Sequence, residues 1–256
     1  MKKLSAICAV AFATLFAGNA FALDTTEQLD YGVVEVAPTI GLANIHDGKP
    51  GWLSDISLGY GVADFMTIYT NFTMESEISL APADFGFDFD LLTTLYDSEN
   101  FDVDFHVDFA YGITITPGFE FNYDSNNDMS GFGAYLKLDL PIYSAHFAAE
   151  DEVDEDGEVT KEEVRTDFDL ALGIGLYYTI MEGNQLFAEG GLKVNQMAKK
   201  LADKRTVDGY IAVGYNVEIA ENIELISEVR VDIPDEKDDT NATISVGMIF
   251  DIPTAK

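Results

Sequence analysis

The chain has 256 residues, and its 14 Lys and Arg against 46 Asp and Glu give a formal net charge of −32. Such an acidic chain repels nucleic acid and attracts cations. Because 47% of its residues are hydrophobic and 12% are aromatic, the acidity does not indicate disorder: this much apolar surface needs a place of burial.

The first 22 residues predict a cleaved secretory signal peptide. Two lysines follow Met1, an apolar run covers 4–17, and residues 20–22 read Ala-Phe-Ala, which is an Ala-x-Ala cleavage site. The predicted mature chain, 23–256, forms one domain and has no cysteine, because Cys8 is the only one in the sequence. This excludes a disulfide framework, a thiol catalyst and a cysteine metal site.

Most of the mature chain alternates between apolar and polar residues. Between 101 and 115 the odd positions hold Phe, Val, Tyr and Ile, while the even positions hold three Asp and one His. Successive residues of a strand point to opposite faces, so this pattern predicts one two-faced strand over 101–115 and excludes a helix. The same alternation occurs in 84–96, 166–180, 207–217, 222–233 and 241–252.

Two kinds of connection separate these runs. Short turns rich in Asp, Asn and Gly lie within 59–65, 96–101, 180–185 and 214–225, and longer polar connections cover 46–51, 75–83, 124–128, 150–165, 198–205 and 235–240. The spacing predicts about twelve strands, with a tight turn near Pro141 and a short strand after it; without that turn the count is ten.

No stretch after residue 22 is long and apolar enough for a transmembrane helix, so a membrane-spanning structure would be a closed barrel.

The signal peptide, the alternating runs and the final strand near Phe250 resemble a small Gram-negative outer-membrane β-barrel protein of the porin-like kind. The resemblance covers 31–252 and is one of architecture, not of a diagnostic motif. It implies an all-β fold: a single antiparallel up-and-down barrel with short periplasmic turns and longer extracellular loops. The chain departs from this class at its end, because six residues follow Phe250. Aromatic residues near the ends of the runs fit interfacial girdles, namely Trp52, Tyr60, Tyr96, Tyr178 and Tyr215.

If the apolar faces meet lipid, the polar faces line the interior. The predicted pore-lining residues are Asp88, Asp90, Asp102, Asp104, His106, Asp108, Lys137, Asp167, Asp169, Lys193, Asp208, Glu224, Glu228, Arg230 and Asp232. Carboxylates that surround a pore favour cations, so we expect a narrow pore for passive diffusion of small cationic or neutral solutes. One alternative is a closed structural barrel filled by its own side chains, because eight-stranded barrels are filled and barrels of sixteen strands are open. Another is a soluble periplasmic β-protein with its apolar faces inside.

The stretch 152–163 matches the twelve-residue calcium loop of the EF-hand in part. Acids, a glycine and a final glutamate fall at the expected positions, and the ligands would be Glu152, Asp154, Asp156, Glu158, Thr160 and Glu163. Position 1 holds Glu where Asp is expected, and a solvated acidic loop explains the same residues. We therefore expect no required cofactor, with Ca²⁺ as a candidate ligand of a structural or adhesive barrel.

A search for catalytic constellations finds none. The chain has three histidines, His46, His106 and His146, with no nucleophile elbow and no histidine-rich metal spacing. The paired aspartates are already explained by strand alternation, so the sequence predicts no enzyme. The expected partners are outer-membrane lipid and small solutes, and the expected location is the cell outer membrane.

Overall fold

The computed structural model describes residues 28–43, 51–77, 84–110, 114–125, 131–148, 162–181, 183–197, 206–234 and 241–254. These ranges form fourteen strands: β1 (Val33–Ala43), β2 (Gly51–Ala63), β3 (Met66–Glu77), β4 (Asp84–Ser98), β5 (Phe101–Ala110), β6 (Thr114–Asp124), β7 (Gly131–Asp139), β8 (Ile142–Ala148), β9 (Glu162–Phe168), β10 (Leu170–Met181), β11 (Asn184–Val194), β12 (Val207–Ala220), β13 (Ile223–Ile233) and β14 (Asn241–Pro253). In this described part of the chain, no helix is long and apolar enough to cross a membrane.

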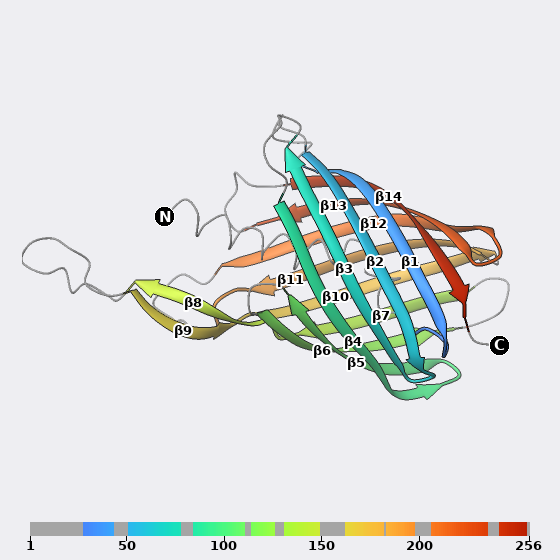
Figure 1. Ribbon diagram of the computed structural model, residues 1–256, viewed down its shortest axis with the longest axis horizontal. Coiled ribbons are helices and arrows are strands. Elements are labelled where there is room, and N and C mark those ends of the chain that lie inside the picture. The colour runs from blue at the N-terminus through green and yellow to red at the C-terminus, as the bar shows by residue number, and fades with distance from the viewer. Residues whose placement is uncertain are drawn as a thin grey trace, which may run out of the picture.

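Twelve of the fourteen described strands close into a barrel. Neighbouring strands pair antiparallel, β7 pairs with β10, and β14 pairs with β1, so β1–β7 and β10–β14 form a ring (Figure 1). At the point of closure, the backbone N–H of Thr254 donates a 2.8 Å hydrogen bond to the carbonyl of Gly32. The predicted all-β, up-and-down barrel is confirmed, with the larger of the two expected strand counts.

The tight turn predicted near Pro141 is wrong. The pairing of Asp139 with Ala171 continues, in the same register, as the pairing of Ile142 with Phe168. Strands β8 and β9 therefore extend the ladder of β7 and β10 beyond the barrel, where they project as a hairpin (Figure 1). Proline has no N–H to donate, and it interrupts the strand at this point without reversing the chain.

The single strand predicted over 101–115 is also wrong. β5 ends at Ala110, β6 begins at Thr114, and these two residues pair with each other. The chain therefore reverses between Ala110 and Thr114, and this reversal contributes the twelfth barrel strand that the turn at Pro141 was expected to supply.

The two ends of the barrel differ in their connections. One end carries the short connections at 64–65, 99–100, 182–183 and 221–222, and we call it the short-turn rim; the other end is the loop rim. In each of the four cases the strand that enters the turn has a register shift just before its end, as is common at barrel rims. The connection after Asp124, which we expected among the longer loops, also lies at the short-turn rim, since the Asp124 N–H donates to the carbonyl of Asn100.

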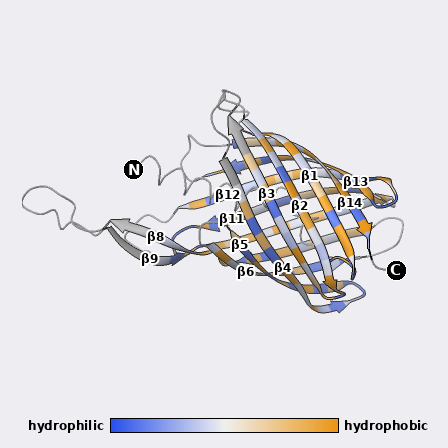
Figure 2. Cartoon of the chain, in the orientation of Figure 1, coloured by the Kyte–Doolittle hydropathy of each residue, from blue (hydrophilic) through white to orange (hydrophobic). Residues whose placement is uncertain are grey.

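The outward face of the barrel is apolar. Along β10, Leu172, Ile174 and Leu176 have exposed fractions of 46%, 56% and 45%. Figure 2 shows apolar and polar residues alternating along the strands, as the sequence pattern predicts. Of the aromatic residues expected in girdles, Trp52, Tyr60, Tyr96 and Tyr178 are exposed, whereas Tyr215 is half-buried and donates a hydrogen bond to Asn184 Oδ1.

Candidate functional site

The interior of the barrel holds most of the chain's buried charges. Of the residues predicted to line it, nine are buried: Asp88, Asp104, His106, Lys137, Asp167, Asp169, Lys193, Glu228 and Arg230. Six are half-buried: Asp90, Asp102, Asp108, Asp208, Glu224 and Asp232. Asp167 differs in position, because it lies on β9 in the projecting hairpin and not in the barrel wall.

The structure adds buried acids that the sequence reasoning did not single out. Glu35 on β1, Asp55 on β2, Glu120 on β6 and Glu189 on β11 have exposed fractions of 3–7%. The sequence signal for these acids was the same alternation: Glu120, for example, lies between the exposed residues Phe119 and Phe121. The shorter or less regular apolar runs around them concealed it.

Amide and hydroxyl groups satisfy many of the inward carboxylates. Asn71 Nδ2 donates to Asp88 Oδ1 over 2.5 Å, and Thr73 Oγ1 lies 3.0 Å from Asp55 Oδ1. Asn122 Nδ2 donates to Asp102 Oδ1 over 2.7 Å. Burial of a carboxylate is costly unless hydrogen bonds or opposite charges compensate it, so these neutral donors hold acids in the wall without cancelling their charge.

Two of the three predicted inward bases, Lys193 and Arg230, contact an acid. Lys193 Nζ lies 2.9 Å from Asp169 Oδ2, and Arg230 Nε lies 2.8 Å from Asp232 Oδ1. The guanidinium of Arg230 also stacks 4.1 Å above the ring of Tyr210, and the Tyr210 hydroxyl donates to Glu189. Charge on this side of the interior is therefore compensated locally.

Several inward aromatic rings lie against glycines of the neighbouring strand. A Cβ at Gly175 would be 1.9 Å from the ring of Tyr135, and one at Gly133 would be 1.9 Å from the ring of Tyr177. These four residues form two cross-strand pairs of β7 and β10. Tyr210 and Phe187 cover Gly191 and Gly214 in the same way. Each ring therefore occupies the space that a side chain would take, and lies along the wall.

The inner face is not uniformly polar. Ala37, Phe187, Ile226 and Ile249 form a buried apolar cluster with Tyr177 packed against it. The first four lie on β1, β11, β13 and β14, and Tyr177 lies on the adjoining β10, away from the acids of β4–β6. The interior thus has an apolar side and an acidic side near the short-turn rim.

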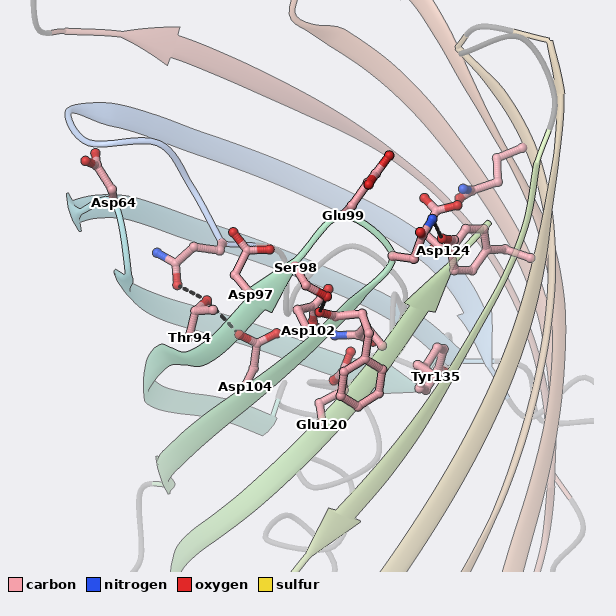
Figure 3. A pocket seen from close by; sticks show the side chains of 16 residues that line it. Asp64, Thr94, Asp97, Ser98, Glu99, Asp102, Asp104, Glu120, Asp124 and Tyr135 are labelled. Atoms are coloured by element: carbon pink, nitrogen blue, oxygen red, sulfur yellow. Dashed lines mark hydrogen bonds between the residues drawn. The ribbon is translucent and has the colours of Figure 1, made fainter. Parts of the chain in front are cut away.

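A pocket of about 540 Å³ opens at the short-turn rim on the acidic side. The lining residues that the structure describes include no Lys, Arg or His, and seven of them are acids: Asp64, Asp97, Glu99, Asp102, Asp104, Glu120 and Asp124. Figure 3 shows most of these carboxylates on the turn from β4 to β5 and on the adjoining strands, with Asp64 on the turn from β2 to β3 and Tyr135 beside them. We call this pocket the acidic mouth. Only Asp102 and Asp104 of its acids were predicted as pore-lining residues.

Asp169 fixes the root of the projecting hairpin at the loop rim. Its Oδ1 accepts hydrogen bonds from the Tyr143 hydroxyl and from the backbone N–H of Gln196, both over 2.9 Å. Lys193 Nζ contacts its other oxygen. Burial and the negative charge of Asp169 raise the pKa of Tyr143 above its ordinary value, so the hydroxyl keeps its proton and donates. One buried carboxylate thus ties β8, β11 and the chain after β11 together.

The predicted calcium ligands lie almost wholly outside the described residues. Glu163 is within β9, while Glu152, Asp154, Asp156, Glu158 and Thr160 precede it. Within the ranges that are described, no group of three or more His, Cys, Asp or Glu side chains is arranged to hold a metal ion.

The sequence matches no family model and no curated protein. Solved structures are similar in fold. The NanC porin is 12% identical, with a TM-score of 0.57 over 85% of this chain and 100% of that chain. The KdgM porin in complex with disordered oligogalacturonate is 10% identical, with a TM-score of 0.55 over 84% and 98%.

An outer-membrane channel from Pseudomonas putida F1 is also 10% identical, with a TM-score of 0.53 over 90% of this chain and 98% of that chain. At these identities the likeness concerns the fold. This chain has the fold of porin-like outer-membrane β-barrels.

Proposed function

We propose that this protein is an outer-membrane pore for passive diffusion of small solutes, with a preference for cations. The outward apolar band supports a place in a bilayer, because exposed residues such as Leu172 and Ile174 would otherwise meet water. The porin-like fold supports a transport role. The proposed pathway follows the barrel axis, with the polar inner faces around it.

The acidic mouth is the observation that carries the cation preference. Seven carboxylates surround one cavity at the short-turn rim, and no base is among the described residues that line it. Farther inside, Lys193 and Arg230 contact acids directly. The field of the interior is therefore most negative at the short-turn rim, where it would concentrate cations and repel anions.

With twelve strands, this barrel is intermediate in size between barrels that are filled by side chains and barrels that leave a channel. Eight-stranded barrels are filled by their side chains, and barrels of about sixteen strands leave a channel. Here the glycines that oppose Tyr135 and Tyr177 let those rings lie along the wall and not across the interior. This arrangement favours an interior that is narrow but open. The apolar cluster around Phe187 and Ile226 narrows the interior from the other side.

Planar-bilayer recording of the purified protein tests the proposal. We expect discrete conductance steps, and a reduced cation preference in a variant with Asp97→Asn, Asp102→Asn, Asp104→Asn and Glu120→Gln. A matched control neutralises Glu218 and Glu221, which are exposed near the same rim but do not line the pocket. Absence of conductance steps at every voltage would overturn the pore; an unchanged preference in the quadruple variant would overturn the role of the acidic mouth.

A second candidate function is binding of Ca²⁺ or a surface partner beyond the loop rim. The supporting observation is the hairpin of β8 and β9, which projects from the barrel (Figure 1) and is joined through residues 149–161. These residues include most of the stretch that matches a calcium loop. Calorimetric titration of Ca²⁺ into wild type and an Asp156→Ala variant tests the calcium version of this function, and no heat above dilution in wild type would exclude calcium binding.

A further inference from the structure

The chain just before β1 lies inside the barrel. Tyr31 and Gly32 form a turn at the short-turn rim, in which the Val33 N–H donates to the carbonyl of Asp30 over 3.0 Å. Gly32 has a φ of +78°, a left-handed conformation that glycine adopts without strain. The turn directs residues 28–30 back into the mouth, and we call these three residues the strap.

Leu29 anchors the strap to the inner wall. Its side chain is 7% exposed and packs in a cluster with Tyr69 and Leu92. Its backbone N–H donates to Thr67 Oγ1 over 2.9 Å. Thr67, Tyr69 and Leu92 are at most 1% exposed, so the strap covers a patch of wall that it fits closely.

Two glycines of β2 provide the space for the strap. A Cβ at Gly59 would be 2.8 Å from Leu29 Cδ1, and a Cβ at Gly61 would be 2.0 Å from the carbonyl oxygen of Asp30. Gly61 also accepts a 2.9 Å hydrogen bond from the Gly32 N–H at its carbonyl. Any side chain at position 61 would collide with strap backbone, which cannot move aside without leaving the wall.

Gln28 joins the strap to the acidic mouth. Its amide lies 2.7 Å from Thr67 Oγ1 and 3.2 Å from Thr94 Oγ1. Thr94 in turn donates to Asp104 Oδ1 over 2.7 Å, and Figure 3 shows this chain of contacts reaching the carboxylates. Gln28 itself lines the pocket, so this residue of the strap forms an uncharged part of the pocket wall.

We propose that the strap sets the size limit of the pore at the short-turn rim. It occupies the β2–β4 side of the mouth, next to the carboxylates of β4 and β5, and its attachment uses contacts that a bare wall would not need. This inference rests on the proposed pore function. It assigns size selection to residues 28–30 and charge selection to the acidic mouth.

A thiol-labelling experiment tests the position of the strap without reference to conductance. Cys8 is the only native cysteine, so Leu29→Cys in a Cys8→Ala background gives a single reporter. We expect a bulky maleimide to label it about tenfold or more slowly than Glu221→Cys on an exposed turn, because labelling requires local opening. Adding Gly61→Val, or the gentler Thr67→Val, should accelerate labelling at position 29. Equal rates for Leu29→Cys and Glu221→Cys would overturn the proposal.

Conductance then tests the role of the strap. In Gly61→Val and Thr67→Val we expect a higher single-channel conductance and entry of larger tetraalkylammonium ions, with the preference for cations over anions retained. A variant that labels quickly at position 29 yet keeps the wild-type size limit would overturn the proposal. Protected labelling in a protein that shows no conductance would overturn the pore, and size selection with it, while leaving the attachment of the strap intact. Failure of the strap proposal and failure of the pore proposal therefore give different results.

Discussion

His106 and Asp139 contact each other across an intervening strand. The distance from His106 Nε2 to Asp139 Oδ1 is 2.8 Å, although His106 is on β5, Asp139 is on β7, and β6 runs between them. Gly118 on β6 pairs with both residues. A Cβ on Gly118 would lie 2.2 Å from the Asp139 oxygen and 2.3 Å from the His106 nitrogen, so the contact depends on the absence of a side chain there.

Gly118→Val should separate His106 from Asp139 and destabilise the barrel. Extra atoms in a packed interior typically cost about 1–3 kcal/mol, and the two separated groups are 4% and 13% exposed. Urea unfolding in detergent or lipid measures the loss of free energy of unfolding. Gly190→Ala is the control, because its Cβ would make only an ordinary 3.4 Å contact with Tyr210 O. Equal stabilities of the two variants would contradict this account.

Gly175→Val should displace the Tyr135 ring from the wall into the interior. The added Cβ would stand 1.9 Å from Tyr135 Cε1, so the ring must turn toward the barrel axis. We expect a lower single-channel conductance than in wild type. Combining the change with Tyr135→Ala should restore conductance, because the displaced ring is then absent.

Gly173→Ala is the matched control on the same strand, since its Cβ would approach Tyr210 Oη no closer than 3.3 Å. If Gly175→Val conducts as well as this control, the aromatic rings do not border the conducting path.

Asp169→Asn should loosen the root of the projecting hairpin. The change removes the charge that Lys193 contacts and weakens the bonds from Tyr143 and Gln196. Breaking a buried ion pair costs about 3–5 kcal/mol, and we expect the effect to be local to the loop rim. Trypsin cleavage at Arg165, an exposed residue of β9, should accelerate about tenfold or more as local opening becomes easier.

Asp97→Asn is the control for that experiment. It also removes one negative charge, but it lies at the short-turn rim, far along the barrel from the hairpin. Unchanged cleavage in Asp169→Asn would show that the hairpin root does not depend on this carboxylate.

The sequence predicted the class of fold correctly but misplaced one reversal of the chain, for a geometric reason. Paired residues of an antiparallel ladder lie on the same face, and Phe109 pairs with Ile115. These positions are separated by an even number, so the alternation continues from β5 to β6 without a break in phase. No count of apolar positions could reveal that turn.

The turn predicted near Pro141 was wrong for a different reason. Proline often marks a turn, but here the strand continues past it, and its carbonyl accepts a 2.8 Å hydrogen bond from the Asp169 N–H. Whether such a break ends a strand depends on a partner that lies 28 positions along the chain, and local sequence does not contain that information.

The candidate site could be predicted in part. Alternation identified Asp104, His106 and Arg230 as residues of the polar faces, and the structure has them buried. Whether they border a conducting path stays a prediction. The acidic mouth gathers residues from β4, β5 and β6 with Gln28, and the strap depends on Gly61 facing Asp30. Both depend on which strands lie side by side and on the fold-back of the chain before β1, and local alternation of apolar and polar residues does not contain that information.

The reversal potential of wild-type protein in a KCl gradient measures whether the pore prefers cations. Because seven carboxylates and no described base line the short-turn mouth, the account predicts a potential of the sign that K⁺ permeation produces. The preference should weaken as salt rises, since about 1 M salt shortens the screening length to roughly 3 Å. A potential of the sign that Cl⁻ produces, or a barrel that conducts neither ion, would contradict the account.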